Sequence, residues 1–223
     1  VKDAPDAVQM PQIKGDVAFD HVTFSYEDGI PILHDVSFKV QQGETIAIVG
    51  PTGAGKTTIV NLLSRFYNVD RGTVKIDGID ISKVTLRSLR EQMGVMMQDS
   101  FIFSGTIMDN IRYGNKKASD EDVIRAAKTV CAHDFIVQME DGYNTQVNER
   151  GSRLSVGQRQ LISFARALLA DPAILILDEA TSSIDTETEI VLQEGLSHLL
   201  EGRTSFIIAH RLSTIKNANR IMY

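Results

Sequence analysis

The sequence has few of the residues that define several broad classes of protein. It holds one cysteine, Cys131, five prolines and no tryptophan among 223 residues. One thiol cannot form an internal disulfide, so Cys131 is most simply interpreted as a small buried apolar residue of an intracellular protein. The formal net charge is −6 and no basic cluster stands out, which argues against a nucleic acid as partner.

Long apolar segments are also missing. The stretch from Ala173 to Leu177 is only as long as a buried strand, whereas a membrane span needs about 20 apolar residues. No signal peptide is visible, so we expect that this chain does not cross a membrane by itself. Hydrophobic residues make up 43% and charged residues 23%, the balance of a soluble globular protein with one large or two small domains.

Strand and helix patterns follow one another along the chain. Strands are expected at residues 17–24, 32–40, 45–49, 74–76, 94–97, 174–177 and 205–209. Helices are expected from the glycine-rich turn to Phe66 and at residues 123–137, 158–169 and 186–200. Strands at both ends of a mostly helical middle predict an α/β core with a helical insert.

The turn after the predicted strand at 45–49 matches the phosphate-loop pattern of two glycines, Lys and Thr. It comprises Gly50, Pro51, Thr52, Gly53, Ala54, Gly55, Lys56 and Thr57, and we count the next residue, Thr58, with it. Glycines let backbone N–H groups point at phosphates, and the following helix adds its positive end. Lys56 can reach the β- and γ-phosphates, and Thr57 offers a hydroxyl to Mg²⁺. The alternative is a chance glycine-rich turn, but a position between a buried strand and a helix is the context that the motif requires.

The predicted strand at 174–177 ends in two acids, Asp178 and Glu179. If it lies beside the phosphate loop, Asp178 enters the magnesium shell. Glu179 then faces the γ-phosphate, where it can orient or deprotonate the attacking water. A solvated strand end is the alternative for such a pair. The phosphate loop upstream favours the catalytic interpretation.

Residues 151–160, Gly-Ser-Arg-Leu-Ser-Val-Gly-Gln-Arg-Gln, resemble the signature motif of ATP-binding-cassette (ABC) proteins, whose usual core is Leu-Ser-Gly-Gly-Gln. Gln158 lies 20 residues before Asp178, as in that family. The resemblance covers residues 16–223. It implies a P-loop NTPase core at 16–98 and 171–223, with a mixed sheet, flanking helices and an antiparallel β subdomain. An α-helical subdomain that carries the signature is expected to be inserted at about 99–170.

The resemblance also implies roles for single residues. Tyr26 resembles the aromatic residue that stacks on adenine, and Asp185 the acid of a loop that communicates across a dimer. Gln98 resembles the glutamine that touches Mg²⁺ and the attacking water, and His210 the histidine that contacts the γ-phosphate. Taken singly, Tyr26 could be a half-exposed strand residue and His210 a capped core histidine. The expected catalytic residues are Glu179, His210, Gln98 and Lys56, and the expected metal ligands are Thr57, Gln98 and Asp178.

In this family two such domains pack head to tail around two ATP molecules. The resemblance therefore implies that Ser155, Gly157 and Gln158 bind the ATP held by a partner domain, at a helix N-terminus that suits anions. Val156 departs from the pattern, which usually has glycine there. Either the backbone at Val156 is ordinary or this half of the contact is weakened, which leaves a heterodimer with unequal sites open.

Two further segments resemble those of exporters within the family. Residues 97–107 with 110–111 are similar to the segment after the glutamine loop, and residues 147–151 to the loop that contacts membrane-domain helices. We therefore expect an ATP-hydrolysing exporter motor that works on the cytoplasmic face of a membrane. Its expected partners are a second ABC ATPase domain and a transmembrane domain. Residues 1–15 are expected to be a linker from that domain, and the family domain is expected to continue past Tyr223.

Two other functions stay open from the sequence. One is a soluble ABC ATPase that acts on ribosomes or DNA, although such proteins usually carry twin cassettes or long coiled-coil inserts. The other is a regulatory module that binds ATP without hydrolysing it, which the presence of Glu179 and His210 argues against. The resemblance implies that membrane helices select the transported substrate, and we expect those helices to lie outside this sequence.

Overall fold

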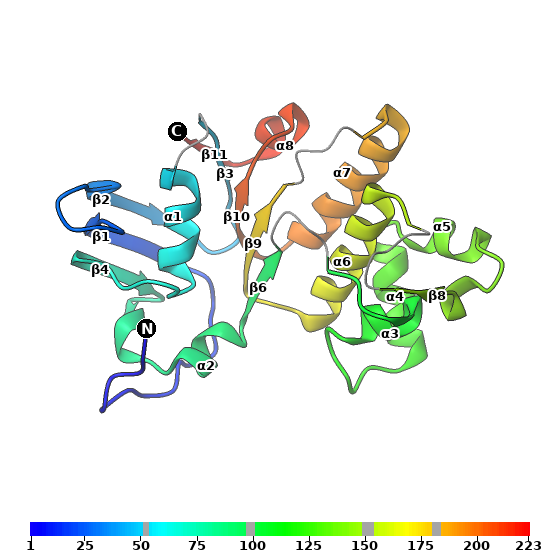
Figure 1. The fold of residues 1–223 in the computed structure, drawn as a ribbon, viewed down its shortest axis with the longest axis horizontal. Coiled ribbons are helices and arrows are strands. Elements are labelled where there is room, and N and C mark those ends of the chain that lie inside the picture. The colour runs from blue at the N-terminus through cyan, green and yellow to red at the C-terminus, as the bar shows by residue number, and fades with distance from the viewer. Residues whose placement is uncertain (51–53, 97–100, 149–153, 180–183) are drawn as a thin grey trace. The chain divides into compact units, whose positions relative to one another are not determined.

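The computed structural model describes residues 1–50, 54–96, 101–148, 154–179 and 184–223. The chain forms two compact units (Figure 1). The first unit comprises residues 1–95, 172–179 and 202–223, and the second comprises residues 96–171 and 180–201. The first unit is mostly β and contains both ends of the chain. Along the sequence, its segments therefore flank the segments of the helical second unit.

Four antiparallel strands form one sheet of the first unit, in the order β2–β1–β4–β5. Their bounds are β1 Val17–Phe24, β2 Leu33–Val40, β4 Arg71–Ile76 and β5 Ile79–Asp80. The buried residues of β1 are Val17, Phe19, Val22 and Phe24. The alternation of buried and exposed side chains is therefore shifted by one residue between Phe19 and Val22. The pairing of β1 with β2 shifts register between Phe19 and Val22, and such an irregularity returns the apolar face to the core.

A second sheet of the first unit has the order β11–β3–β10–β9–β6. Its strands are β3 Thr45–Ile48, β6 Met93–Met96, β9 Ile174–Asp178, β10 Thr204–Ile208 and β11 Arg220–Met222. The strands β11, β3, β10 and β9 pair in parallel. Every residue of β3, β9 and β10 is buried, which explains their continuous apolar runs, because parallel strands are covered on both faces.

The helical segments of this unit are α1 Ala54–Leu63, η1 Ile81–Lys83, α2 Leu86–Arg90 and α8 Leu212–Asn217. Buried side chains of α1 share one hydrophobic core with residues of both sheets. The N-terminal stretch joins this core as well, because Met10 and Ile13 are buried and Val8 bridges to Val84. Residues 8–13 therefore pack on the first unit.

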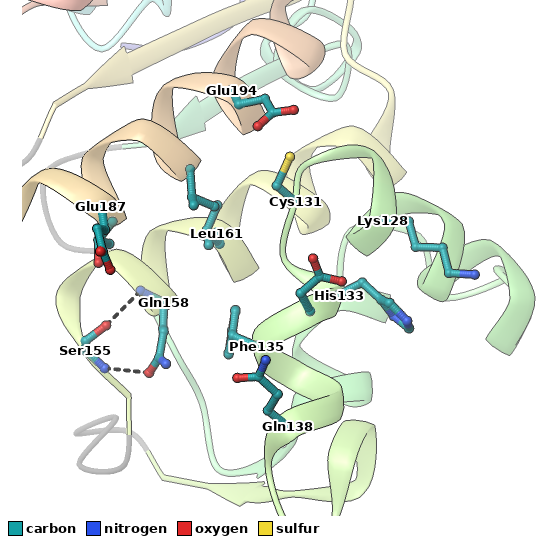
Figure 2. A pocket seen from close by; sticks show the side chains of 13 residues that line it. Lys128, Cys131, His133, Phe135, Gln138, Ser155, Gln158, Leu161, Glu187 and Glu194 are labelled. Atoms are coloured by element: carbon teal, nitrogen blue, oxygen red, sulfur yellow. Dashed lines mark hydrogen bonds between the residues drawn. The ribbon is translucent and has the colours of Figure 1, made fainter.

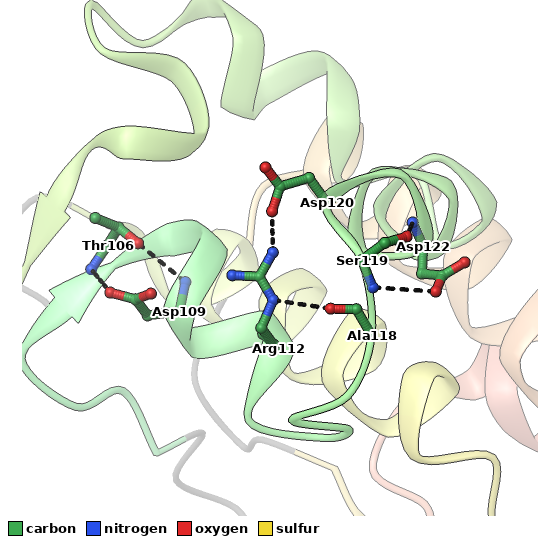
Figure 3. Close-up of polar contacts among 7 residues, drawn as sticks. All are labelled: Thr106, Asp109, Arg112, Ala118, Ser119, Asp120 and Asp122. Atoms are coloured by element: carbon green, nitrogen blue, oxygen red, sulfur yellow. Dashed lines mark hydrogen bonds and ion pairs between the residues drawn. The ribbon is translucent and has the colours of Figure 1, made fainter.

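The second unit is built mainly from helices. They are α3 Ile107–Arg112, α4 Asp120–Thr129, α5 His133–Gln138, η2 Gly142–Asn144, α6 Val156–Ala170 and α7 Thr186–Leu200, with a short pair of strands, β7 Gly105–Thr106 and β8 Gln146–Val147. Thr106 and Ser119 start α3 and α4 with reciprocal capping boxes to Asp109 and Asp122 (Figure 3). These local signals fix the helix starts, since each box satisfies two free N–H groups.

The helix expected over residues 123–137 is interrupted. Here α4 ends at Thr129, α5 begins at His133, and Cys131 between them has a left-handed φ of 65°. The neighbouring α7 passes close by, so that a Cβ on Gly195 would lie 2.2 Å from the carbonyl oxygen of Val130. Side-chain periodicity does not report such a backbone break, because both halves keep an apolar face toward the unit interior.

The α/β P-loop NTPase fold with an antiparallel β part and a helical insert, which the sequence predicts, is confirmed. The expected division assigned residues 171–223 to the core, whereas residues 180–201 group with the second unit. Leu192, Leu196 and Leu199 of α7 are buried there. In the described ranges, no helix has the length and apolar character that a bilayer crossing requires.

Candidate nucleotide site

Three neighbouring strands of the first unit end at the same edge of their sheet. Ile208 of β10 pairs with Ile48 of β3 on one side and with Asp178 of β9 on the other. Asp178 therefore lies two strands away from Ile48, or about 10 Å at the usual strand spacing. Because the chain turns into the phosphate loop after Ile48, the loop and the acidic strand end share the carboxyl edge of the sheet, where α/β folds bind ligands.

The described part of the phosphate loop includes a backbone conformation that favours glycine. Gly50 has a φ of 145°, which a residue with a side chain rarely adopts. The ammonium group of Lys56 donates a hydrogen bond to the carbonyl oxygen of Gly50 at 2.9 Å. Lys56 thus folds over its own loop and has further N–H groups for phosphate oxygens. Gly55, Lys56 and Thr57 are half-buried in the first turns of α1.

Asp178 carries a buried oxygen that is suited to bind a cation. Its side chain is buried, and Oδ1 accepts no hydrogen bond from any described residue. The ring Nε2 of His210 lies 3.4 Å from this oxygen, too poorly aligned to satisfy it. A buried oxygen without a donor is unfavourable unless another group binds it. In the described ranges no cluster of three His, Cys, Asp or Glu side chains could hold a metal ion, so any ion here would need hydroxyl or phosphate oxygens as further ligands.

Glu179, the residue after β9, is only 3% exposed and makes an extensive set of hydrogen bonds. Its Oε1 accepts the backbone N–H groups of His210 and Arg211 at 3.0 and 3.2 Å. Its Oε2 accepts the hydroxyl of Thr214 at 2.7 Å, and the guanidinium of Arg211 lies 3.7 Å away. Among the described residues, the segment that follows β10 therefore supplies the groups that compensate the buried carboxylate.

Tyr26 lies directly beyond β1 and is 40% exposed. Its hydroxyl is hydrogen-bonded to the hydroxyl of Thr58 at 3.0 Å and accepts the side-chain amide of Asn61 at 3.3 Å. Its ring contacts those of Phe24 and Tyr67 edge to face, with centroids 4.8 and 4.9 Å apart. Tyr26 is therefore held beside α1, while the buried hydroxyl of Thr58 is bonded to Tyr26 and points away from solvent.

In the second unit, Ser155 starts α6 with a capping box (Figure 2). The Ser155 hydroxyl accepts the N–H of Gln158 at 3.1 Å, and the Gln158 side chain accepts the N–H of Ser155 at 3.0 Å. No described residue accepts the hydroxyl proton of the exposed Ser155, so this proton can be donated to a phosphate oxygen. Val156 is the first residue of α6, so its backbone is ordinary and the valine is accommodated without a positive φ. Ser155 and Gln158 border a cavity of ≈ 880 Å³.

Gly157 and Asp185 are linked through one threonine. A Cβ on Gly157 would lie 2.3 Å from the Cγ2 methyl of Thr188, so α6 and α7 approach closely at this glycine. Asp185 caps α7 and accepts the hydroxyl of Thr188 at 2.6 Å and its N–H at 3.1 Å. These two hydrogen bonds lower the pKa of Asp185.

The described residues of the predicted site thus fall into two groups. Gly50, Lys56, Asp178, Glu179 and His210 come together at one sheet edge of the first unit, and Tyr26 and Thr58 bond each other beside α1. Ser155, Gly157, Gln158 and Asp185 lie at the starts of α6 and α7 in the second unit. Pro51, Thr52, Gly53 and Gln98 lie outside the described residues, and nothing is described of the Ala54 side chain.

Sequence reasoning missed Thr214, Arg211, Asn61 and Thr188. The hydroxyl of Thr214 lies 35 positions from Glu179 along the chain, and no motif marks it. Thr188, three residues after Asp185, could have been found, because an aspartate at an N-cap accepts the backbone N–H of the residue two or three positions on.

The geometry agrees with comparisons to known proteins. Residues 33–182 match the family model described as ABC transporter. The chain therefore belongs to the ABC transporter family, as the sequence predicts, and corresponds to its ATP-binding domain. The ATP-binding domains of this family are ATPases, so the predicted enzyme class and the predicted ATP binding are confirmed.

Several known proteins are similar to this chain over its whole length. The uncharacterized ABC transporter ATP-binding protein YknV of Bacillus subtilis is 59% identical over 222 residues, which cover 100% of this chain and 37% of that protein. An ATP-dependent lipid A-core flippase of Syntrophus aciditrophicus is 48% identical, with the same two coverages. A bacterial Atm1-family ABC exporter solved with ATP bound has a TM-score of 0.88 and 44% identity, and this chain covers 39% of it. The chain thus spans less than two-fifths of the curated relatives' length.

Proposed function

We propose that this chain is the motor domain of an ABC exporter and that it hydrolyses MgATP at the carboxyl edge of its parallel sheet. The observation that supports this most is the strand register that aligns Asp178 with Ile48, two residues before the phosphate loop. In the proposal, Gly50 and the loop residues 51–55 hold the phosphates with backbone N–H groups, and Thr58, which was predicted with the loop, orients Tyr26 through its hydroxyl. Tyr26 stacks on the adenine.

In the proposed reaction, a water oxygen attacks the γ-phosphorus and the bond to the β–γ bridging oxygen breaks, which leaves ADP and phosphate. Glu179 accepts a proton from that water, and Lys56 and His210 stabilise the charge on the γ-phosphate. Gln98 orients the water. Thr57, Asp178 and Gln98 would hold Mg²⁺ with the phosphates, and the ion supplies charge neutralisation when bound. The buried Asp178 Oδ1 without a donor supports this ligand assignment.

The second unit is proposed to serve a partner domain. Ser155, with its free hydroxyl proton, and the N–H of Gly157 would bind the γ-phosphate of ATP held by a second ABC ATPase domain, and Gln158 would support them through the capping box. Asp185 would lie in the loop that communicates between the two domains. ATP then joins the domains, and hydrolysis separates them, which couples the chemistry to motion.

The motor is proposed to act on a transmembrane domain at the cytoplasmic face of a membrane. The names of the relatives support this, since they include a flippase and an Atm1-family exporter, and the identities are high over all of this chain. The soluble ABC ATPase considered from the sequence is not favoured, because the relatives compared above are transporters or transport enzymes by name.

The test is a pair of variants in the full-length protein that carries this sequence. Glu179→Gln is expected to lower ATP hydrolysis by about 10²–10⁴-fold while MgATP affinity is retained, because the amide keeps the carboxylate's shape. Lys56→Ala is expected to weaken MgATP binding. Glu44→Gln is the matched control. Glu44 also accepts a backbone N–H and pairs with an arginine, but it directly precedes β3 and so lies at the opposite edge of the sheet from Glu179. Wild-type hydrolysis by Glu179→Gln would refute the assigned base.

A further inference from the structure

Thr214 makes a contact with Glu179 that no motif predicts. It lies in α8, is 3% exposed, and donates its hydroxyl to Glu179 Oε2 at 2.7 Å. This is the length of a charge-assisted hydrogen bond between a hydroxyl and a carboxylate, which is about twice as strong as a neutral one. Both partners are buried, so water does not compete for either group.

The other hydrogen bonds of Glu179 leave little freedom. A carboxylate has about four lone-pair positions, two on each oxygen. The N–H groups of His210 and Arg211 both point at Oε1. The Arg211 guanidinium at 3.7 Å from Oε2 is too far for a hydrogen bond. Among the described residues, the Thr214 hydroxyl is therefore the group that occupies one lone-pair position of Oε2, and it determines which lone-pair position of that oxygen stays unoccupied.

A general base needs one open lone pair that is aimed at the proton it accepts. We propose that Thr214 is a positioning residue for Glu179: its hydroxyl occupies one side of Oε2 and turns the other side toward the attacking water. The proposal rests on the proposed role of Glu179 as the base. The backbone N–H groups fix Oε1 whatever the side chains are, but the rotation of the carboxylate about that anchor depends on Thr214.

Three variants of the full-length protein test this role. Thr214→Val keeps the shape and removes the hydroxyl, and it is expected to lower kcat for ATP at least about tenfold, since small misplacements of a catalytic group have large effects on rate. The KM for MgATP is expected to stay within about twofold, because Thr214 does not touch the nucleotide in the proposal. Thr214→Ser restores the hydroxyl and is expected to recover kcat to within about twofold of the wild type.

The matched control is Thr204→Val. Thr204 is also fully buried in the first unit, and its hydroxyl accepts the N–H of Gly43 and donates to the carbonyl of Gly15, at 3.1 and 2.7 Å. Thr204 is the first residue of β10, at the end of the strand that lies away from Glu179. Both valine variants lose a buried hydroxyl and are expected to lower the unfolding temperature, but only Thr214→Val is expected to lower kcat.

A further measurement uses the double variant, in which Thr214→Val is combined with Glu179→Gln, and includes the affinity for MgATP. There Thr214→Val is expected to leave both MgATP affinity and the residual hydrolysis unchanged, because the group that Thr214 positions is already inactive. Wild-type kcat in Thr214→Val, an equal kcat loss in Thr204→Val, or failure of Thr214→Ser to recover would each overturn the proposal. If Thr214→Val does not fold, Thr214→Ala and Thr214→Cys replace it, and kcat must then follow the hydroxyl and not the side-chain volume. Wild-type hydrolysis by Glu179→Gln alone would instead remove the proposed base.

Discussion

Gly157→Ala is the change whose effect follows most directly from the packing of α6 on α7. The added Cβ would lie 2.3 Å from Thr188 Cγ2, whereas carbon atoms prefer about 3.5 Å or more, so the two helices must separate locally by about 1 Å. Overpacking of this kind costs about 1–3 kcal/mol. The better helix propensity of alanine offsets at most about 1 kcal/mol. The variant is therefore expected to be destabilised by about 1–2 kcal/mol.

The destabilisation is measured as a fall of the unfolding temperature, expected at about 3–6 °C for a domain of this size. Thr188→Ser supplies the decisive comparison, because it removes the clashing methyl and keeps the hydroxyl that Asp185 accepts. The double variant is expected to recover at least about half of the lost stability, since residues in contact couple by about 0.5–3 kcal/mol. A Gly157→Ala protein as stable as the wild type, or a double variant as unstable as the single one, would refute the packing argument.

Three further predictions concern the second unit. Gly195→Ala is expected to destabilise the protein by at least about 1 kcal/mol despite its helical position, because the Cβ would meet the Val130 carbonyl at 2.2 Å; increased thermal stability would contradict this. Arg166→Lys is expected to lower the free energy of unfolding by about 2 kcal/mol in urea titrations, because the half-buried guanidinium donates to backbone carbonyls from two nitrogens and lysine cannot reproduce that fork. Asp185→Asn tests the pKa that the Thr188 hydrogen bonds lower. Since the folded-state pKa is below the unfolded one, the charge stabilises the fold at neutral pH, and this advantage over Asp185→Asn is expected to vanish as pH falls below about 4 in urea titrations; a pH-independent difference would contradict it.

The bonded pair of Tyr26 and Thr58 illustrates what the structure adds to a predicted site. Both residues were predicted for the nucleotide site, Tyr26 as an adenine platform and Thr58 as an extension of the phosphate loop. The fully buried hydroxyl of Thr58 instead bonds the Tyr26 hydroxyl at 3.0 Å. Thr58 therefore orients the tyrosine, which its place in the sequence could not indicate because the two residues are 32 positions apart.

Local patterns predicted most of the strands and helices closely. The strand at 17–24 and the helix at 186–200 have the predicted bounds, and most of the other predicted elements differ by one to three residues at their ends. The short elements β5, α2, β7, β8, α8 and β11 had no predicted bounds. The break at Cys131 and the grouping of α7 with the helical unit were not predicted. Both depend on how closely α7 approaches Val130 and α6, and such approaches arise from packing between segments that are distant in the sequence.

The sequence by itself determined the family, the phosphate loop and the acidic strand end, because each is a short pattern whose chemistry requires particular residues at particular spacings. Only the tertiary structure decided what surrounds them. The alignment of Asp178 with Ile48 depends on β10 inserting between two strands. The hydrogen bonds of Glu179 depend on the chain after β10 folding back over the strand end. Strand order and long-range hydrogen bonds follow from burial of the whole core, so no local stretch of residues encodes them.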